Sequence, residues 1–147
     1  MVGETHISNL LKSMEPSLMH GDFVFCTIQD AKYGDFAELL PMASFCEAEG
    51  LTLLLTKENA DKAGFDYDSM FKGIVLKVYS SLEAVGLTAA ISSKLAGRGI
   101  SANVIAACYH DYIFVPAEKA EVALSALTEL SRQPVASSED TKNRATD

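Results

Sequence analysis

Apolar positions along this chain follow two spacings, one typical of helices and one typical of strands. Four apolar residues near the N-terminus recur at helical spacing: Ile7, Leu10, Leu11 and Met14. They predict a short amphipathic helix over residues 6–14, which Pro16 ends. The six residues from Phe23 to Ile28 are rich in aromatic and β-branched side chains and predict a strand.

The next strand-like runs predict a hairpin. Residues 42–47 and 51–56 lie on either side of a tight turn at Glu49-Gly50. Residues 57–63 then predict a short helix, and Gly64 stands where helices often end in a left-handed residue.

A strongly β-prone run over residues 73–79 opens the second half of the chain. Three apolar residues then recur four positions apart: Leu87, Ile91 and Leu95. This spacing predicts a helix with one apolar stripe against a sheet, and the segment Gly97-Arg98-Gly99 ends it.

A second hairpin and a final helix follow. The runs 101–107 and 112–115 flank a corner at residues 109–111. Pro116 suits the first position of a helix, which the apolar spacing extends over residues 117–131.

The two halves of the chain are related by a constant sequence offset. Residues 53–63 align without a gap on residues 113–123, with three identities in eleven positions and coincident strand-to-helix transitions. We therefore predict two repeats, over residues 1–70 and 71–132, joined by the strand at 73–79. Residues 133–147 show no periodicity, and we predict that they form a disordered tail.

Charge and hydropathy exclude two classes of partner. The net charge is −8 and no two Lys or Arg residues are adjacent, so the chain lacks the clustered positive charge that nucleic-acid binding needs. Its longest apolar stretches are far shorter than the roughly 20 residues that span a bilayer. Without a secretory leader, we expect a cytoplasmic protein.

The apolar residues and the cysteines refine this interpretation. Hydrophobic residues make up 48% of the chain, which favours burial of some apolar surface in a homodimer or a higher homo-oligomer. Cys26, Cys46 and Cys108 are too widely spaced for a metal or redox motif, so we expect buried, inert thiols in a reducing compartment.

Few side chains suggest catalysis or metal binding. The paired acids and the histidines are Glu47 with Glu49, His110 with Asp111, and the isolated His6 and His20. The paired acids flank a hairpin turn, where a solvated edge is expected, and an adjacent His and Asp at a turn usually point apart. The isolated histidines lack partner ligands, and Gly97-Arg98-Gly99 follows a helix, whereas phosphate loops precede one. We therefore expect no catalytic residues, no metal and no cofactor.

The segment from Glu83 to Ile105 resembles the ACT domain, a family of amino-acid-sensing modules. The family pattern reads acid-x-Pro-Gly-x-Leu, then a helix, then Gly-Ile-Asn-Ile, and Glu83, Gly86 and Gly99-Ile100 stand at matching positions. Val85 stands where the family often has Pro, and Ala102 intervenes before Asn103. Through the segments 45–53 and 80–90, the chain also looks like an uncharacterised bacterial family of tandem ACT-like proteins.

This resemblance implies an α+β fold of two ferredoxin-like βαββαβ repeats, with antiparallel sheets and helices on one face. It also implies a ligand between the first strand-to-helix loop and the second strand of a repeat. The candidate ligand-binding residues are Glu83, Val85, Gly86 and Leu87 in the loop, and Asn103, Val104 and Ile105 in the strand. Gly86 would let backbone approach a ligand, and Asn103 offers both a donor and an acceptor.

Two functions remain open at this point. The resemblance implies a regulatory or sensor protein that binds a small molecule, an amino acid above all. The alternative is a ligand-free homodimeric interaction scaffold, in which Gly86 only relieves crowding at a turn and the strand residues pack the core. An enzyme is the third and least favoured class, because these residues assemble no nucleophile, base and orienting group.

Overall fold

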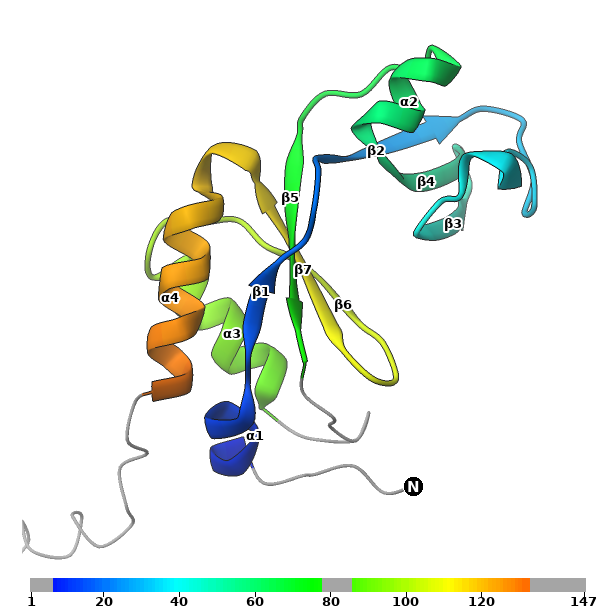
Figure 1. The fold of residues 1–147 in the computed structure, drawn as a ribbon. Helices are drawn as coiled ribbons and strands as arrows, with labels where there is room; N and C mark the ends of the chain where they lie inside the picture. The colour runs from blue at the N-terminus through cyan, green and yellow to red at the C-terminus, as the bar shows by residue number, and fades with distance from the viewer. Residues whose placement is uncertain (1–6, 78–85, 133–147) are drawn as a thin grey trace, which may run out of the picture.

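The computed structural model describes residues 7–77 and 86–132. Its strands form one antiparallel sheet in the order β3-β4-β2-β5-β7-β6, and β1 also pairs with β5 (Figure 1). The helices are α1 Ile7–Ser13, α2 Lys57–Ala63, α3 Leu87–Ala96 and α4 Ala120–Arg132, with short 3₁₀ helices at η1 Ala37–Leu39 and η2 Ala117–Lys119. The strands are β1 Pro16–Leu18, β2 Phe23–Ile28, β3 Ala43–Glu47, β4 Gly50–Thr56, β5 Phe71–Leu76, β6 Asn103–Ala106 and β7 Asp111–Pro116.

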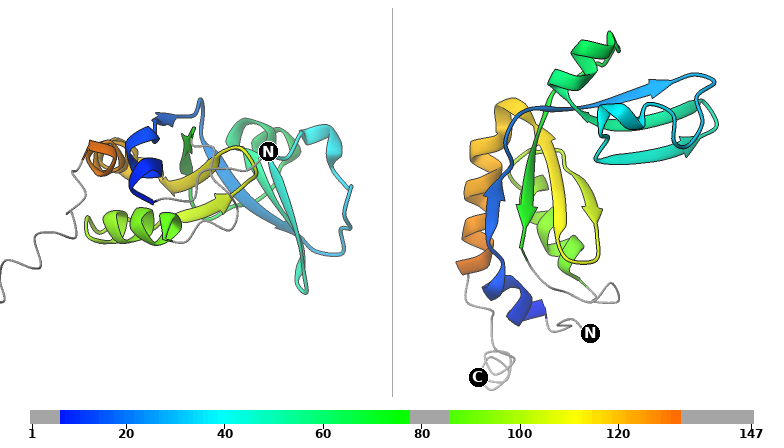
Figure 2. Two further views of the ribbon diagram at one scale, coloured as in Figure 1. Left: turned by 90° about the horizontal axis from the view of Figure 1, so that it is seen from below. Right: turned by 45° about the vertical axis from the view of Figure 1, so that its right-hand side comes forward.

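The sheet bends where the first half meets the second. Only Phe23 and Phe71 pair between β2 and β5, whereas β5 pairs along its whole length with β7. Figure 2 shows β2, β3 and β4 turned away from the strands of the second half as a result. This architecture confirms the predicted α+β fold of two ferredoxin-like units, with β5 between them.

The sequence patterns did not predict strand β1. Pro16 to Leu18 pair antiparallel with Leu76 to Ile74, so β1 supplies an edge strand to the second half. Pro16 ends α1 and fixes an extended chain, and a strand this short shows no visible alternation. Although α1 and β1 belong to the predicted first repeat, they pack on the second half, and the division between the repeats remains a prediction.

Two cores lie on the sides of the sheet that carry helices. In the second half, Ile113 of β7 packs with Ile91 of α3 and Leu127 of α4. In the first half, Leu53 of β4 packs with Ala60 of α2, and Leu39 of η1 closes the cluster. Within each hairpin, alternate residues therefore bury one face of a strand beneath helices.

A third, aromatic core lies on the opposite side of the strands. The ring of Phe23 packs edge to face on Phe114 with centroids 5.4 Å apart, and Phe25 lies 5.4 Å from Phe71. Phe25 also lies 6.3 Å from Phe114. These rings come from both halves, so the aromatic core holds the bend of the sheet together.

Several boundaries differ from those expected. The strand predicted over 73–79 runs from Phe71 to Leu76, and residues 78–79 lie outside the described part of the chain. Pro116 is the last residue of β7, and the 3₁₀ helix η2 separates it from α4. The predicted tail, residues 133–147, also lies outside the described residues.

The cysteines differ from expectation in two cases of three. Cys26 is buried, as the sequence predicted, and burial raises the pKa of its thiol. Cys46 and Cys108 are exposed. Cys46 lies on β3, at an end of the strand order, and Cys108 lies in the turn between β6 and β7, so both thiols reach solvent.

Candidate functional site

The structure places the predicted loop residues in three situations. Glu83 and Val85 lie outside the described residues. Gly86 caps the N-terminus of α3 in a left-handed conformation with φ 97°, and the space around its missing side chain is open. Leu87 is 4% exposed and packs in the core of the second half, so its side chain faces away from solvent.

The predicted strand residues lie on β6, at the end of the strand order. Asn103 is exposed, and its side-chain amide donates a hydrogen bond of 3.4 Å to the carbonyl of Phe114. Val104 packs on the helix side and Ile105 on the aromatic core, as the alternation of a strand requires. Leu87 and Val104 thus belong to one apolar cluster, while Asn103 and Ile105 face the other way.

The register of the two hairpins confirms the internal repeat. Ala43 lies opposite Leu54 in the first hairpin, and Asn103 lies opposite Phe114 in the second. The pairs that follow keep the same sequence offset, through Cys46 with Leu51 and Ala106 with Asp111. The predicted strand site at residues 103–105 therefore has its structural counterpart at residues 43–45.

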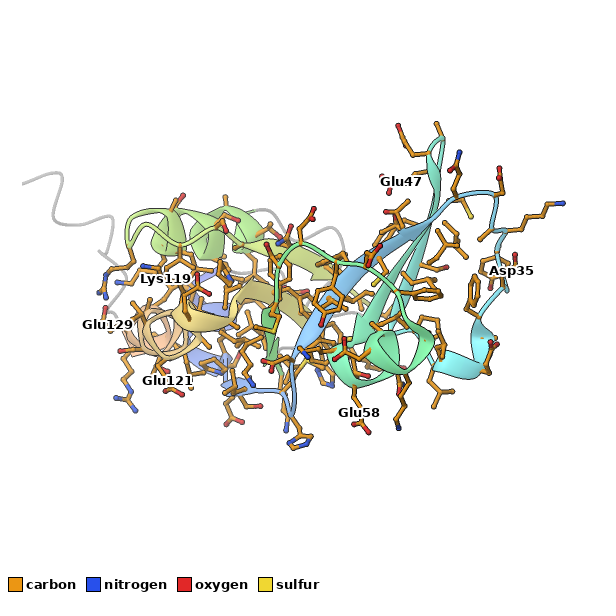
Figure 3. The ribbon with its side chains drawn as sticks, turned by 90° about the horizontal axis from the view of Figure 1, so that it is seen from above. Asp35, Glu47, Glu58, Lys119, Glu121 and Glu129 are labelled. Carbon is orange, nitrogen blue, oxygen red and sulfur yellow. The ribbon has the colours of Figure 1, made fainter. Side chains whose placement is uncertain are left out.

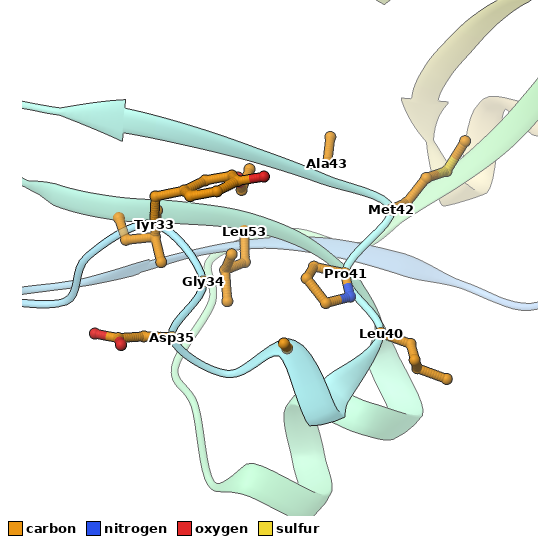
Figure 4. A pocket seen from close by; sticks show the side chains of 11 residues that line it. Tyr33, Gly34, Asp35, Leu40, Pro41, Met42, Ala43 and Leu53 are labelled. Carbon is orange, nitrogen blue, oxygen red and sulfur yellow. The ribbon is translucent and has the colours of Figure 1, made fainter.

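A pocket lies at that counterpart position, in the first repeat. Its volume is about 400 Å³, and it opens between the loop after β2, the 3₁₀ helix η1 and the start of β3 (Figure 4). The lining residues are Tyr33, Gly34, Asp35, Ala37, Leu40, Pro41, Met42, Ala43, Ser44, Leu51 and Leu53. The loop after β2, the helix η1 and the strand β3 thus surround the pocket. The family resemblance implies the same arrangement of loop, helix and strand around the predicted site of the second repeat.

Local hydrogen bonds hold the wall of the pocket in place. The Asp35 carboxylate accepts a bond of 2.8 Å from the backbone N–H of Lys32. The amide of Asn59 on α2 donates to the carbonyl of Leu39, which ties η1 to the neighbouring helix. The sequence patterns predicted no element in this segment, because turn geometry of this kind leaves no hydrophobic period.

The segment between β2 and β3, which includes this wall, carries backbone strain. Asp30, Phe36 and Leu40 have φ values of 63°, 65° and 53°, and they are the non-glycine residues with positive φ in the described chain. A left-handed conformation costs a residue with a side chain about 1–2 kcal/mol. Such residues cluster at ligand clamps and switch regions, which supports a functional role for this segment.

The pocket is apolar inside and acidic in charge. Leu51 and Leu53 are buried, and Ser44 adds a hydroxyl at the strand. Among the described residues that line the pocket, Asp35 is the one with a charge. Figure 3 shows acidic side chains, among them Glu47 and Glu58, projecting from this half of the protein as well. The site can therefore bury an apolar group and accept hydrogen bonds from a cationic one.

The adjacent pair His110 and Asp111 does not converge on one point. The His110 ring packs edge to face against Tyr112 with centroids 6.4 Å apart, and Tyr112 belongs to the aromatic side of the sheet. Asp111 alternates instead with Ile113 and Val115, which face the helices. Among the residues that the structure describes, no group of three or more His, Cys, Asp or Glu side chains could hold a metal ion.

Asp111 is a residue that sequence reasoning considered only for catalysis. It is 5% exposed, and burial raises the pKa of its carboxyl group. Its counterpart in the first repeat is Leu51, on the floor of the pocket. The constant offset between the repeats was the signal that could have placed Asp111 at the candidate site of the second repeat.

Within residues 7–77 and 86–132, no helix combines the length and the apolar character that crossing a membrane requires.

Comparison with known proteins gives the family and the fold. One ACT domain model matches residues 2–72 and a second matches residues 72–129. A protein of unknown function from Vibrio cholerae, described as a possible transport protein, is 53% identical, with a TM-score of 0.77. That match covers 86% of this chain and 96% of the Vibrio protein. No curated protein matches the chain.

Two more distant structures share the fold alone. A protein from Agrobacterium tumefaciens is 12% identical with a TM-score of 0.66, over 80% of this chain and 89% of that protein. The regulatory subunit of aspartate kinase from Thermus thermophilus is 13% identical with a TM-score of 0.57, over 81% of this chain and 99% of that subunit. With two consecutive family matches and the repeated hairpin register, the chain belongs to the ACT domain family.

Proposed function

We propose that the chain is a regulatory protein without catalytic activity, which binds a small molecule and senses an amino acid. ACT domains are regulatory ligand-binding domains, and this chain carries two of them. The observation that carries the proposal is the pocket of about 400 Å³ beside strand β3, whose first two residues, Ala43 and Ser44, line it. It lies where this fold brings a strand-to-helix loop against the second strand of a repeat.

The size and lining of the pocket suit a small metabolite. Ligand sites in proteins commonly measure roughly 300–1,000 Å³ and combine apolar walls with a few polar groups. Here Leu51 and Leu53 supply the apolar floor, and Ser44 and Asp35 supply the polar groups. An amino acid with a short apolar side chain fits both the volume and this division.

The second repeat offers another position for the same ligand class. There we propose that residues 83 and 85–87 and the strand Asn103 to Ile105 line a groove. Open space beside Gly86 and the exposed amide of Asn103 support this proposal. Because the two hairpins share one register, both positions can be tested with matched substitutions.

A thermal-shift screen of the whole chain against the twenty amino acids tests the function. A ligand present at about 100 times its dissociation constant adds about 2.7 kcal/mol to stability, which gives a clear shift in melting temperature. Ser44→Phe should fill the first pocket and remove the shift. Cys46→Phe places the same bulk two residues along the same face, outside the lining residues, and should keep it.

The responses of the variants show which repeat binds the ligand, or that neither does. Loss of the shift in Gly86→Val and Asn103→Ala, with Ser44→Phe unaffected, would move the site to the second repeat. A flat response to every amino acid would contradict ligand binding and favour the alternative of an interaction scaffold.

We also propose that the protein forms a homodimer or a higher homo-oligomer in the cytoplasm. Strands β3 and β6 stand at the two ends of the strand order, and β3 exposes the apolar ring of Phe45. Edge strands with apolar side chains favour pairing with another chain. The free thiols of Cys26, Cys46 and Cys108 suit a reducing compartment. A monomer mass by light scattering at micromolar concentration would contradict the self-association.

A further inference from the structure

We infer that the pocket of the first repeat recognises an apolar amine, through its ammonium group and its side chain, and makes little use of a ligand carboxylate. The inference rests on the proposed function, because it names the ligand chemistry of the same site. It predicts that the pocket prefers an ammonium group to a carboxylate, because of the charges and hydrogen bonds of the pocket wall.

The first argument is the single charge of the pocket. Asp35 is the charged residue among the lining side chains, and its Oδ2 accepts the bond from the Lys32 N–H. A carboxylate has about four acceptor positions, so Oδ1 and the remaining lone pair can receive an ammonium group. Tyr33 precedes Asp35 on the same loop and is 82% exposed, so its ring is accessible to the same cation.

The second argument is the lack of a partner for a bound carboxylate. Neither Lys nor Arg nor His is found among the described residues that line the pocket. Three backbone amides along the wall are used already. Asp35 N–H donates to Lys32, Leu40 N–H to Ala37 and Met42 N–H to Leu54. A ligand carboxylate would therefore find neither a cation nor these amides.

The third argument is the division of the pocket into a polar and an apolar side. Figure 4 shows Tyr33 and Asp35 on one side, with Leu40, Pro41 and Met42 on the other and Leu53 between them. An apolar side chain of a ligand would lie on Leu53 while its ammonium group faces Asp35. Burial of a branched aliphatic group on such a floor gains roughly 25 cal/mol per Å².

The charge of the whole chain acts in the same direction. The net charge is −8, and acidic side chains surround both halves (Figure 3). A field of this sign attracts cations and slows the approach of anions. Acidic amino acids are therefore the poorest candidates for this pocket.

Isothermal titration calorimetry of the whole chain with three probes separates the contribution of the ligand's ammonium group from that of its carboxylate. L-leucine carries both charges, L-leucinamide keeps the ammonium group and lacks the carboxylate, and N-acetyl-L-leucine keeps the carboxylate and lacks the ammonium group. We expect leucinamide to bind within about threefold of leucine, and N-acetyl-leucine to bind at least about tenfold more weakly, the loss of one charged hydrogen bond.

A matched pair of variants tests the carboxylate. Asp35→Asn keeps an oxygen to accept the Lys32 N–H and should weaken leucine binding about tenfold. Glu38→Gln makes the same change in net charge on η1, at a residue outside the lining set, and should leave the affinity within about twofold.

The results distinguish this inference from the proposed function. If leucine binds but leucinamide does not, or if Asp35→Asn leaves the affinity unchanged, the inference is overturned and ligand binding stands. If no leucine derivative binds while an acidic amino acid does, the inference is also overturned and the sensor proposal survives. If neither leucinamide nor any amino acid binds, both are wrong.

Discussion

Phe23 on β2 and Phe114 on β7 pack edge to face across the bend of the sheet, with their ring centroids 5.4 Å apart. The two rings belong to different repeats, and β2 meets β5 at only one residue pair. Side-chain packing in the aromatic core, rather than a long ladder of hydrogen bonds, therefore joins the repeats. Substitutions in the aromatic core should therefore destabilise the protein.

Phe114→Ala should lower the free energy of unfolding by about 3–5 kcal/mol, because it leaves a cavity among buried rings. Phe45→Ala is the control, since Phe45 is 43% exposed and should cost less than about 1 kcal/mol. Urea unfolding measures both variants. Equal losses would show that the aromatic core does not carry the junction.

Gly50→Ala should also be strongly destabilising. Gly50 has φ 146°, and an added Cβ would lie 2.5 Å from the carbonyl oxygen of Ile28, a backbone atom that cannot move freely. Gly21 has φ 82° with open space around it. Gly21→Ala should therefore lower the free energy of unfolding only by the cost of a left-handed conformation for alanine, about 1–2 kcal/mol. A thermal melt in which Gly50→Ala equals Gly21→Ala would contradict the close contact.

Leu40→Asn should raise stability by roughly 0.5–1 kcal/mol. Leu40 is 80% exposed in a left-handed conformation, so it adds strain with little burial, and Asn tolerates that conformation better. Differential scanning calorimetry measures the gain. A lower melting temperature would mean that the Leu40 side chain supports the pocket wall more than its exposure indicates.

Asp111→Leu, which copies the first repeat, should stabilise the protein more at neutral pH than in acid. Burial raises the folded-state pKa of Asp111 above its ordinary value of 3.8, so the folded state holds this proton more tightly than the unfolded state does. Stability from this group is thus present at low pH and is lost as the pH rises through that range. At pH 7 the cost of burying the charged Asp111 carboxylate applies in full. Removing that carboxylate should raise the free energy of unfolding by roughly 1–3 kcal/mol.

Urea unfolding at pH 3.5 and pH 7 checks the sign of this effect. The gain in Asp111→Leu should be larger at pH 7. Val122→Ala on α4 removes no titratable group from an exposed position and is the control, so its effect should be the same at the two pH values. A gain that does not change with pH would mean that packing, rather than charge burial, decides the stability at this position.

Local patterns predicted the long elements because each one repeats a single spacing. The helix through Leu87, Ile91 and Leu95 and the hairpin strands at 42–56 have enough residues for the period to appear, and the structure contains both. The constant offset between the halves likewise predicted the repeat, which the register of Ala43 and Asn103 confirms in space.

The candidate site was only partly accessible from the sequence. The resemblance led to residues 83–87 and 103–105 in the second repeat, whereas the pocket described above, in the part of the chain that the structure describes, lies on Ala43 and Ser44 in the first. Tyr33, Gly34 and Asp35 carry no family pattern, and their conformation depends on hydrogen bonds within a turn. Only the equivalence of the two hairpins connects the pocket to the prediction.

The sequence by itself determined the longer helices and strands, the repeat and the family, because these follow from residue spacing and local preference. The tertiary structure alone decided that β1 joins β5, that the sheet bends at Phe23 and Phe71, and that Asp111 is buried. These features depend on contacts between residues far apart in the chain. Their free energy comes from packing and desolvation in three dimensions, which no local pattern encodes.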